Sequence, residues 1–401
     1  MIGAGPRLEE IGRTQGSASA PQVRSWPIGP VVPAAPAWDK PRDIGRCDTL
    51  ARLRWIVKGI VVAESAERMG ASTTGSVRTP QGGDARPGAP AVVRVRAPAR
   101  LHFGFLDMHG GLGRRFGSIG LAVDTPALQI KATAAPRASA KGPEAERIRS
   151  YLLAAAAHLD VSEAVAIEVE EAIPAHAGFG SGTQLALAVA AALARLNGRT
   201  VDLLDFADVL DRGNRSGVGL AAFTEGGLIV DGGRDGTGAP PPVISRISWP
   251  EAWRVVLILD EGATGVHGGR ESEAFRDLPP FEEARAAEIC RIALMQVLPS
   301  VATGNLDGFG RGITTIQERI GDYFAPHQGG RYASADVAQV LQAVAARGVS
   351  GYGQSSWGPT GFALMPTEHD AQELVASLDR PGRLRFVIAK GRNEGATVSA
   401  L

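Results

Sequence analysis

Residues 173–198 read IPAHAGFGSGTQLALAVAAALARLNG and join a short glycine-rich turn directly to a long segment of alanine and leucine. Ahead of this turn, apolar Val165, Ile167 and Val169 alternate with polar residues, which is the pattern of a half-buried strand. Pro174 ends that strand, and the segment after the turn has the apolar spacing of a helix. The stretch therefore predicts a strand, a turn and a helix in close succession.

The turn itself predicts a place where an anion binds. Gly178, Gly180 and Gly182 leave the backbone free to turn its amides toward a ligand, and Ser181 or Thr183 can cap the helix. Unpaired amides at the start of a helix attract anions. The turn lacks the lysine of a GxxxxGK[ST] phosphate loop and the last glycine of a GxGxxG dinucleotide motif. An ordinary strand-to-helix turn remains the alternative interpretation.

The composition is that of a globular chain without a strongly charged face. Hydrophobic residues make up 44% of the 401 residues, and 42 basic residues balance 42 acidic ones. This balance argues against a nucleic-acid partner. Two cysteines are too few for a disulfide framework or a zinc cluster, so we expect a cytoplasmic protein. Because the sequence contains no apolar run long enough to span a bilayer, we expect no membrane partner.

We expect three segments along the chain. Residues 1–90 are rich in proline, glycine, serine and arginine, and they predict a disordered N-terminal extension. The predicted first domain covers 91–245 and contains the glycine-rich turn, and the predicted second domain covers 246–401. Strands and helices do not alternate regularly in either domain, so the predicted fold class is α+β. Strands are expected at 91–108, 118–134, 165–173, 227–233, 253–260, 360–366 and 384–391, and helices at 143–159, from the turn to about 196, and at 201–212, 281–298, 305–323, 334–347 and 368–380.

Three segments together resemble a known family. They are PARLHFGFLDMHG at 98–110, IPAHAGFGSGTQLALAVAAAL at 173–193 and GYGQSSWGPTGFAL at 351–364. In order and spacing they are similar to the three sequence blocks of the GHMP kinase superfamily, and more specifically to its non-kinase branch, the beta-ribofuranosylaminobenzene 5'-phosphate synthase family. The resemblance covers roughly 92–395. It implies a ribosomal-protein-like βαβ N-terminal domain, a ferredoxin-like C-terminal domain and a homodimer.

The resemblance also implies an activity. Members of that family join phosphoribosyl diphosphate to 4-aminobenzoate or 4-hydroxybenzoate and release CO2 and diphosphate, in tetrahydromethanopterin biosynthesis. Several GHMP kinases carry an aspartate base in a Ser-Gly-x-Asp turn, whereas the segment RSGVGLAAF here has Gly219 at the nearest equivalent. A small-molecule kinase that uses ATP remains the second hypothesis. A sugar-phosphate sensor without catalytic activity is the third.

Three residues are predicted to be catalytic by this resemblance. Asp107 would stabilise the positive charge that develops on the ribose, and its alternative role is to form a turn. Arg114 would pair with a carboxylate or with the 5'-phosphate, as would Arg115, and the alternative is a solvated loop. His176 would donate a hydrogen bond to phosphate or transfer a proton, and the alternative is a loop histidine that faces water.

The remaining predicted site residues are binding residues. We expect Mg²⁺ to neutralise the diphosphate, with Asp107 and Asp124 as the nearest candidate ligands in the sequence. A competing pattern at 260–265, acidic residues followed by a Thr/Gly turn, resembles the ribose-phosphate loop of other phosphoribosyltransferases, or is simply a capping turn. The predicted substrate- and phosphate-binding residues are Arg100, His102, Arg115, Gly178, Gly180, Ser181, Gly182, Thr183, Gln184, Gln354 and Ser355.

Overall fold

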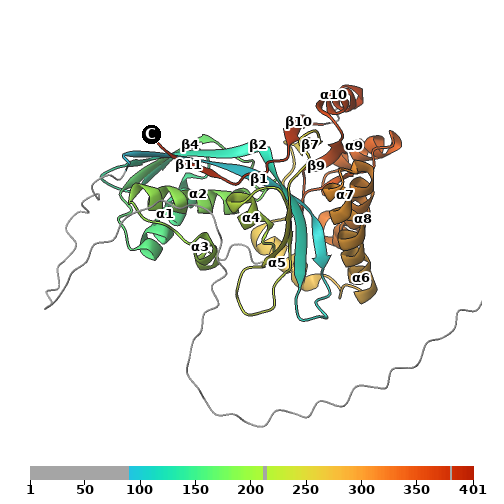
Figure 1. Cartoon of the computed structure of the whole chain (residues 1–401), viewed down its shortest axis with the longest axis horizontal. Helices are drawn as coiled ribbons and strands as arrows, with labels where there is room; N and C mark the ends of the chain where they lie inside the picture. Colours follow the sequence, from blue (N-terminus) through green and yellow to red (C-terminus); the bar gives the residue numbers. More distant parts are fainter. Residues whose placement is uncertain (1–89, 211–214, 380–381) are drawn as a thin grey trace, which may run out of the picture. The chain divides into compact units, whose positions relative to one another are not determined.

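The computed structural model describes residues 90–210, 215–379 and 382–401. The predicted extension, apart from its last residue, lies outside this part of the chain. Within it, two sheets with helices packed against them confirm the predicted α+β class (Figure 1). None of the described helices is both long and apolar enough to pass through a membrane.

The first sheet is built around two long antiparallel strands, β1 (Val92–Asp107) and β2 (Phe116–Ala134). β4 (Val165–Glu171) pairs antiparallel with β2, and β3 (Ser139–Lys141) runs parallel to β4. Because α1 (Ala145–Leu159) connects these two parallel strands, the region contains the βαβ unit expected of the first domain.

The helix after the glycine-rich turn lies at the centre of the first domain. This helix, α2 (Ser181–Leu196), packs on β1 and β2 and touches three further helices, α1, α3 (Leu203–Val209) and α4 (Val218–Thr224) (Figure 1). A helix with neighbours on all sides must be apolar around its whole circumference. The alanine-rich sequence meets this requirement, because residues from Gln184 to Ala194 are all buried.

Three short strands complete the first sheet. β5 (Leu228–Asp231) pairs with β2, β6 (Val243–Ile247) pairs with β5, and β11 (Thr397–Ala400) pairs with β1. The sequence does not predict β6 or β11, because neither has buried alternating residues. The last strand of the chain thus returns to the first sheet. The predicted domain boundary at 245 stays a prediction.

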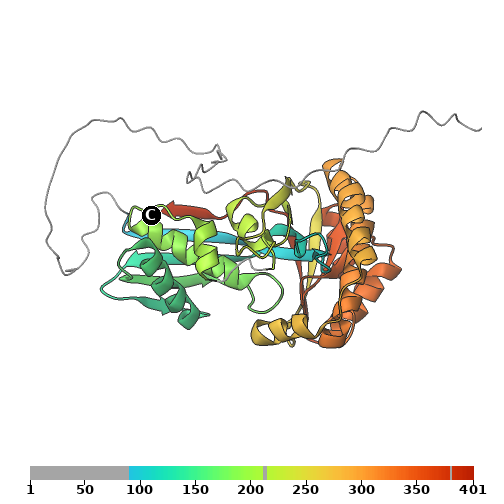
Figure 2. The ribbon, with the colours of Figure 1, turned by 90° about the horizontal axis from the view of Figure 1, so that it is seen from below.

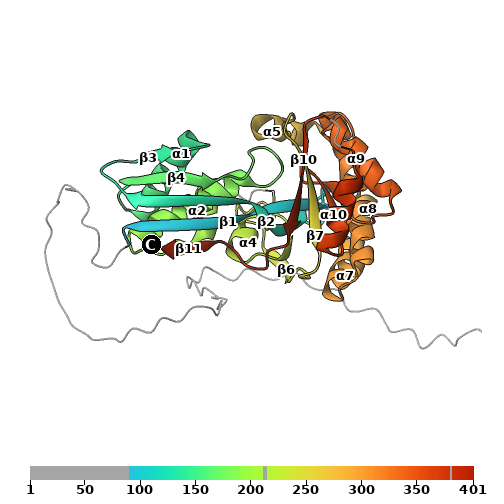
Figure 3. The same ribbon diagram turned by 90° about the horizontal axis from the view of Figure 1, so that it is seen from above.

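The second sheet has four antiparallel strands in the order β10, β7, β9, β8. Alternate residues of β7 face two different layers. Val256 and Ile258 pack with α9 (Ala335–Ala346) and α10 (Glu368–Ser377), and Val255 and Leu257 face the main core. Figure 3 shows β7 and β10 between the first sheet and α9 and α10. The bounds of the strands are β7 (Arg254–Asp260), β8 (Tyr352–Gln354), β9 (Gly361–Met365) and β10 (Leu384–Lys390).

The chain between β7 and β8 is helical. It contains α5 (Gly268–Asp277), α6 (Glu283–Ile292), the π-helical turn η1 (Ala293–Val297), α7 (Leu298–Ala302) and α8 (Leu306–Gln328), drawn in yellow to orange in Figure 2. α6, η1 and most of α8 fall in predicted helical segments, whereas α5 and all of α7 after Leu298 do not. The polar sequence of α5, with only Ala274 buried, explains why no apolar period indicated it.

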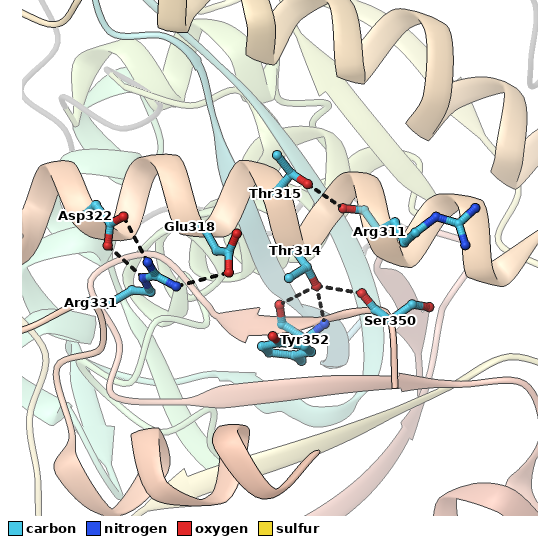
Figure 4. Close-up of polar contacts among 8 residues, drawn as sticks. All are labelled: Arg311, Thr314, Thr315, Glu318, Asp322, Arg331, Ser350 and Tyr352. Atoms are coloured by element: carbon cyan, nitrogen blue, oxygen red, sulfur yellow. Dashed lines mark hydrogen bonds and ion pairs between the residues drawn. The ribbon is translucent and has the colours of Figure 1, made fainter. Parts of the chain in front are cut away.

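Polar contacts anchor β8 to α8. The Thr314 hydroxyl donates to the Ser350 carbonyl at 2.7 Å and accepts from the Tyr352 amide at 3.1 Å (Figure 4). Farther along α8, Asp322 pairs with Arg331 at 2.7 Å and so ties the segment ahead of α9 to the helix (Figure 4). These bonds hold the third sequence block, 351–364, in a fixed position beside β1.

Candidate active site

A cavity of about 420 Å³ lies where the three sequence blocks meet. Its wall includes β1, the glycine-rich turn with the first residues of α2, and the segment after β8. α1, the segment ahead of α4 and the start of α5 complete it. Segments far apart in the sequence therefore contribute to a single site.

The first turn of α2 opens into this cavity without a side-chain cap. Gly180 occupies the N-cap position with a left-handed φ of 71°, and Ser181 is the first helical residue. The prediction that Ser181 or Thr183 caps the helix is therefore wrong, because no side chain accepts from the first amides. Uncapped amides together with the positive end of the helix dipole form a site for an anion.

Two side chains hold the turn in place. The carbonyl of Gly178 accepts from the guanidinium of Arg100 at 2.7 Å and from the hydroxyl of Ser355 at 2.6 Å. A Cβ at Gly178 would lie 2.3 Å from the Ser355 carbonyl oxygen, so only glycine fits there. The third block thus packs against the turn. Burial lowers the pKa of Arg100 to about 10, partly offset by Glu271, and the group stays charged at neutral pH.

Among the described residues, three arginines line the cavity: Arg100, Arg147 and Arg215. Arg147 extends from α1, where it pairs with Glu144 and donates to the Tyr151 hydroxyl at 3.1 Å. Arg215 precedes α4 and pairs with Glu271 of α5 at 3.1 Å. These positive groups surround the start of α2, which makes this end of the cavity suited to a multiply charged anion.

Two histidines stack at the cavity wall. The rings of His176 and His267 lie 3.7 Å apart at 24° to each other. Burial lowers the pKa of His176 below its usual value, and the nearby His267 and Arg147 lower it further. The backbone carbonyl of His176 accepts from the Gly265 amide at 3.0 Å, which ties the turn to the segment before α5.

Part of the wall is aromatic. His102, Phe105 and Trp357 line it, and the His102 and Phe105 rings lie 4.6 Å apart. Burial lowers the pKa of His102 well below its usual value, and the charge of Arg100 acts in the same direction. The cavity therefore combines cationic groups with an aromatic surface that carries a neutral imidazole.

The structure brings many of the predicted site residues together and places others elsewhere. Within the described chain, the predicted site residues that lie elsewhere do not line the cavity. Those that line the cavity are Arg100, His102, His176, Gly178, Gly180, Ser181, Gly182 and Thr183, and those placed elsewhere are Asp107, Arg114, Arg115, Gln184, Gln354 and Ser355.

The residues of the 107–115 loop make local contacts. Asp107 accepts from the amides of His109 and Gly110, both at 2.8 Å, which is the turn-forming role that the sequence left open. Arg114 donates to the carbonyl of Gly232 at 2.8 Å, and Arg115 to the carbonyl of Met108 at 3.0 Å. Asp107 and Arg114 therefore do not face the cavity together, and their catalytic role stays a prediction.

The two predicted glutamines are buried structural donors. Gln184 donates to the carbonyl of Gly219 at 2.7 Å and so joins α2 to α4. Gln354 accepts from the Ala333 amide at 2.7 Å and donates to Gln328 at 3.2 Å. Both are buried and neither lines the cavity, so their predicted binding role stays a prediction.

The acidic candidates outside the first block have structural partners. Asp124 accepts from the Lys390 amide at 2.8 Å. Asp260 accepts from the Ser334 hydroxyl at 2.6 Å, and Glu261 pairs with Arg385 at 2.8 Å, which matches the capping-turn interpretation. Within the described residues, no three His, Cys, Asp or Glu side chains are grouped to hold a metal ion.

Sequence reasoning missed four charged or ionisable residues of the cavity, Arg147, Arg215, His267 and Glu271, and also the aromatic residues Phe105 and Trp357. Arg147 lies on a predicted helix that matched no motif. Arg215 directly precedes the serine and glycine of the kinase-like turn, which was the one signal available for it. His267 and Glu271 belong to the polar α5 region, and only the tertiary fold brings them to the site.

The fold and the glycine-rich turn define a protein of the GHMP kinase class. Residues 147–227 match the family described as GHMP kinases N terminal domain, and 297–384 match GHMP kinases C terminal. The structure is similar to that of a homoserine kinase from Cytophaga hutchinsonii, with a TM-score of 0.55 and 17% sequence identity. That similarity covers 77% of this chain and 98% of the kinase, and it shows the shared fold.

Two curated relatives define the family more narrowly. The beta-ribofuranosylphenol 5'-phosphate synthase of Archaeoglobus fulgidus is 32% identical over 326 residues, which is 77% of this chain and 99% of the relative. The protein of the same name from Methanothermobacter thermautotrophicus is 30% identical over 75% of this chain and 97% of its own length. The chain belongs to the beta-ribofuranosylphenol 5'-phosphate synthase family.

Proposed function

We propose that the protein joins phosphoribosyl diphosphate to a 4-substituted benzoate and releases CO2 and diphosphate. One observation carries this proposal: a single cavity contains an uncapped helix start, three arginines and an aromatic wall. The two substrates divide in the same way, because one is a sugar carrying phosphates and the other is an aromatic acid. The family to which the chain belongs supports the same reaction.

The phosphoribosyl substrate fits the cationic part of the cavity. Breaking the bond between ribose C1 and the diphosphate leaves negative charge on the leaving group, and preorganised donors at that position lower the barrier. The amides of the first turn of α2 and the hydroxyls of Ser181 and Thr183 supply such donors. Arg147 and Arg215 add the positive charge that the diphosphate and the 5'-phosphate require.

The acceptor that we propose is 4-hydroxybenzoate. The relatives are named for a ribofuranosylphenol product, and a phenol is formed when the acceptor carries a hydroxyl group. With 4-aminobenzoate, the product would be an aniline. The sequence left these two acceptors open, and the family relation favours the hydroxyl compound.

We also propose Mg²⁺ as the metal that accompanies the diphosphate. Mg²⁺ usually keeps several waters and binds substrate phosphates, so it needs one or two protein ligands rather than a cluster. Glu271 is the acidic side chain among the described residues of the cavity wall, and the Ser181 hydroxyl lies in the same wall. These two oxygen donors fit a hard cation, which would neutralise charge on the leaving group when bound.

Three broader proposals follow from the family resemblance. We place the reaction in tetrahydromethanopterin biosynthesis, the protein in the cytoplasm, and the active form as a homodimer. Sedimentation of the purified protein tests the dimer directly, and a monomer at assay concentration would contradict it.

The decisive experiment supplies phosphoribosyl diphosphate, Mg²⁺ and carboxyl-labelled 4-hydroxybenzoate and measures released CO2. A parallel reaction contains ATP with candidate alcohols and measures ADP. Labelled CO2 together with diphosphate supports the proposal. ADP formation without CO2 would instead support the kinase, and ligand binding without turnover would support the sensor.

A further inference from the structure

We infer that the aromatic acceptor binds against His102, Phe105 and Trp357, and that the His102 imidazole takes the proton from its 4-hydroxyl group. This inference rests on the proposed function and assigns the acceptor subsite within the same cavity. It makes His102 a catalytic residue and Trp357 a binding residue.

The first observation is a pair of polar ring atoms without partners. Nε2 of His102 and Nε1 of Trp357 are both buried and make no hydrogen bond in the described part of the chain. The two side chains belong to residues that are 2% and 3% exposed, and both residues line the cavity. Buried polar atoms nearly always have a partner. Of the five buried side-chain atoms without one in the described residues, these two belong to residues of the cavity wall, where a ligand can supply it.

The second observation is that the protein fixes the backbone of His102 and packs both rings. The His102 amide donates to the Ser355 hydroxyl at 3.0 Å, and the His102 carbonyl accepts from the Ser356 amide at 3.3 Å. The His102 ring packs on Phe105 with centroids 4.6 Å apart, and the Trp357 ring stacks on Phe324 with centroids 4.0 Å apart. These contacts favour one placement of the two rings, which is what a preformed binding site requires.

The third observation is an aromatic surface beside His102 in the cavity wall. Phe105 lies on the same strand as Arg100 and beside His102, and its ring faces the apolar cluster of Phe275 and Phe324. A benzene ring packs favourably against such a wall. The start of α2, with the arginines around it, is left for the phosphoribosyl substrate.

The chemistry of the acceptor requires a base at its 4-hydroxyl group. The ring carbon that carries the carboxylate forms a bond to ribose C1, and the C1–oxygen bond breaks with its electron pair leaving on diphosphate. The hydroxyl oxygen supplies electron density through the ring and gives its proton to His102 Nε2. The bond to CO2 then breaks, its electron pair restores the aromatic ring, and the oxygen regains the proton from His102.

A neutral imidazole suits this role. Burial and the neighbouring Arg100 keep the pKa of His102 low, so its ring is free to accept a proton at neutral pH. A weak base is sufficient, because attack on ribose makes the hydroxyl group strongly acidic. Proton acceptance at the moment of attack is general-base catalysis, which contributes most when the base is held in place.

The inference separates the two acceptors. The amino group of 4-aminobenzoate donates its nitrogen lone pair without first losing a proton, so its reaction depends less on a base. In the variant His102→Gln, kcat/KM for 4-hydroxybenzoate should fall about a hundredfold, the usual contribution of a general base. The fall with 4-aminobenzoate should be much smaller, and KM for phosphoribosyl diphosphate should not change. An equal fall with both acceptors would overturn the role of His102.

Trp357→Phe tests the binding role, because it removes the N–H group and keeps most of the ring. It should raise KM for both benzoates and leave KM for phosphoribosyl diphosphate unchanged. Trp249→Phe is the matched control, since Trp249 is also buried with an unpartnered Nε1 but is not a residue of the cavity wall. Equal effects of the two tryptophan variants would overturn the assignment.

Equilibrium dialysis with labelled 4-hydroxybenzoate distinguishes failure of this inference from failure of the proposed function. One outcome is that the wild-type protein binds the benzoate, that Trp357→Phe weakens this binding, and that no CO2 appears. The acceptor subsite is then correct, and the proposed reaction, with the His102 proton step, is wrong. If CO2 appears but neither variant discriminates as described, the reaction stands and the inference is wrong.

Discussion

Single residues in this fold act through burial. His102 has almost no contact with solvent, and its carbonyl and amide are both bonded to the third block. Arg100, two residues earlier on the same strand, is partly buried with its guanidinium on the glycine-rich turn. One strand thus carries a positive charge next to a neutral imidazole, and the charge of Arg100 lowers the pKa of His102.

This burial predicts a pH-dependent stability. The pKa of His102 is lower in the folded than in the unfolded state, so the unfolded chain binds more protons below about pH 6.5. The contribution of the neutral His102 to the free energy of unfolding is fully present above that pH and is lost as the pH falls. The free energy of unfolding, measured with denaturant, should fall between about pH 7.5 and about pH 5.5. This fall should be smaller in His102→Gln than in the wild type. His369→Gln, at an exposed position on α10, should keep the wild-type loss. A variant of His102 that matches the wild type would contradict the argument.

At the scale of elements, the start of α2 is the proposed site for the phosphates. Gly180 has a φ of 71°, and a Cβ there would lie 3.0 Å from Cγ of Arg100. The helix begins immediately afterwards, so a side chain at this point would displace the arginine and narrow the approach to the amides. The left-handed conformation thus supports both the backbone geometry and the ligand contact.

Gly180→Ala should therefore weaken binding of phosphoribosyl diphosphate, measured by calorimetry. Gly236→Ala is the matched control, because Gly236 has a φ of 82° and a Cβ there would have no other atom within 4 Å. Both substitutions should cost about 1–2 kcal/mol of stability from the left-handed backbone. Only the first should reduce affinity, and unchanged affinity in Gly180→Ala would show that the turn does not bind the ligand.

A chain of hydrogen bonds between elements also links the 107–115 loop to the cavity indirectly. Arg114 donates to the carbonyls of Gly232 and Gly233. The adjacent Asp231, which is fully buried, accepts from the Gly217 amide at 2.9 Å, two residues after Arg215. Arg114 thus contributes to the position of a cavity arginine without lining the cavity.

Arg114→Lys should raise KM for phosphoribosyl diphosphate about tenfold, comparable to the loss of one charged hydrogen bond. A lysine keeps the charge but cannot reach two carbonyls at once. The value of kcat should change little, because the residue positions a binding group rather than a reacting one. Arg319→Lys, which alters a comparable ion pair with Glu288 between α6 and α8, should leave both constants unchanged. A selective fall in kcat would instead favour a direct catalytic role for Arg114.

At the scale of the whole molecule, both sheets and the cavity are built from residues after 90. The first strand begins at Val92, and the last strand, β11, closes the same sheet by pairing Val93 with Ala400. The long-range bonds between β1 and the third block connect the two sheets, with Gln317 donating to the Phe103 carbonyl at 2.6 Å and accepting from the Gln354 amide at 2.7 Å.

Removal of residues 1–88 should therefore leave folding and activity intact. Every strand and helix that lines the cavity follows the truncation point. Thermal unfolding and the CO2 assay, run on the truncated and the full-length protein, check this expectation. Insolubility or loss of activity after truncation would show that the first segment contributes to the fold.

The sequence by itself determined the class of the fold, most of its helices and strands, the glycine-rich turn and its neighbours on β1. These features are local, because a period of apolar residues or a run of glycines acts over a few positions. Tertiary structure alone decided that β11 completes the first sheet, that the polar α5 brings His267 and Glu271 to the cavity, and that Asp107 and Arg114 face other partners. Such pairings depend on which surfaces remain unsatisfied after the core has packed, and that is a property of the whole chain rather than of any short segment.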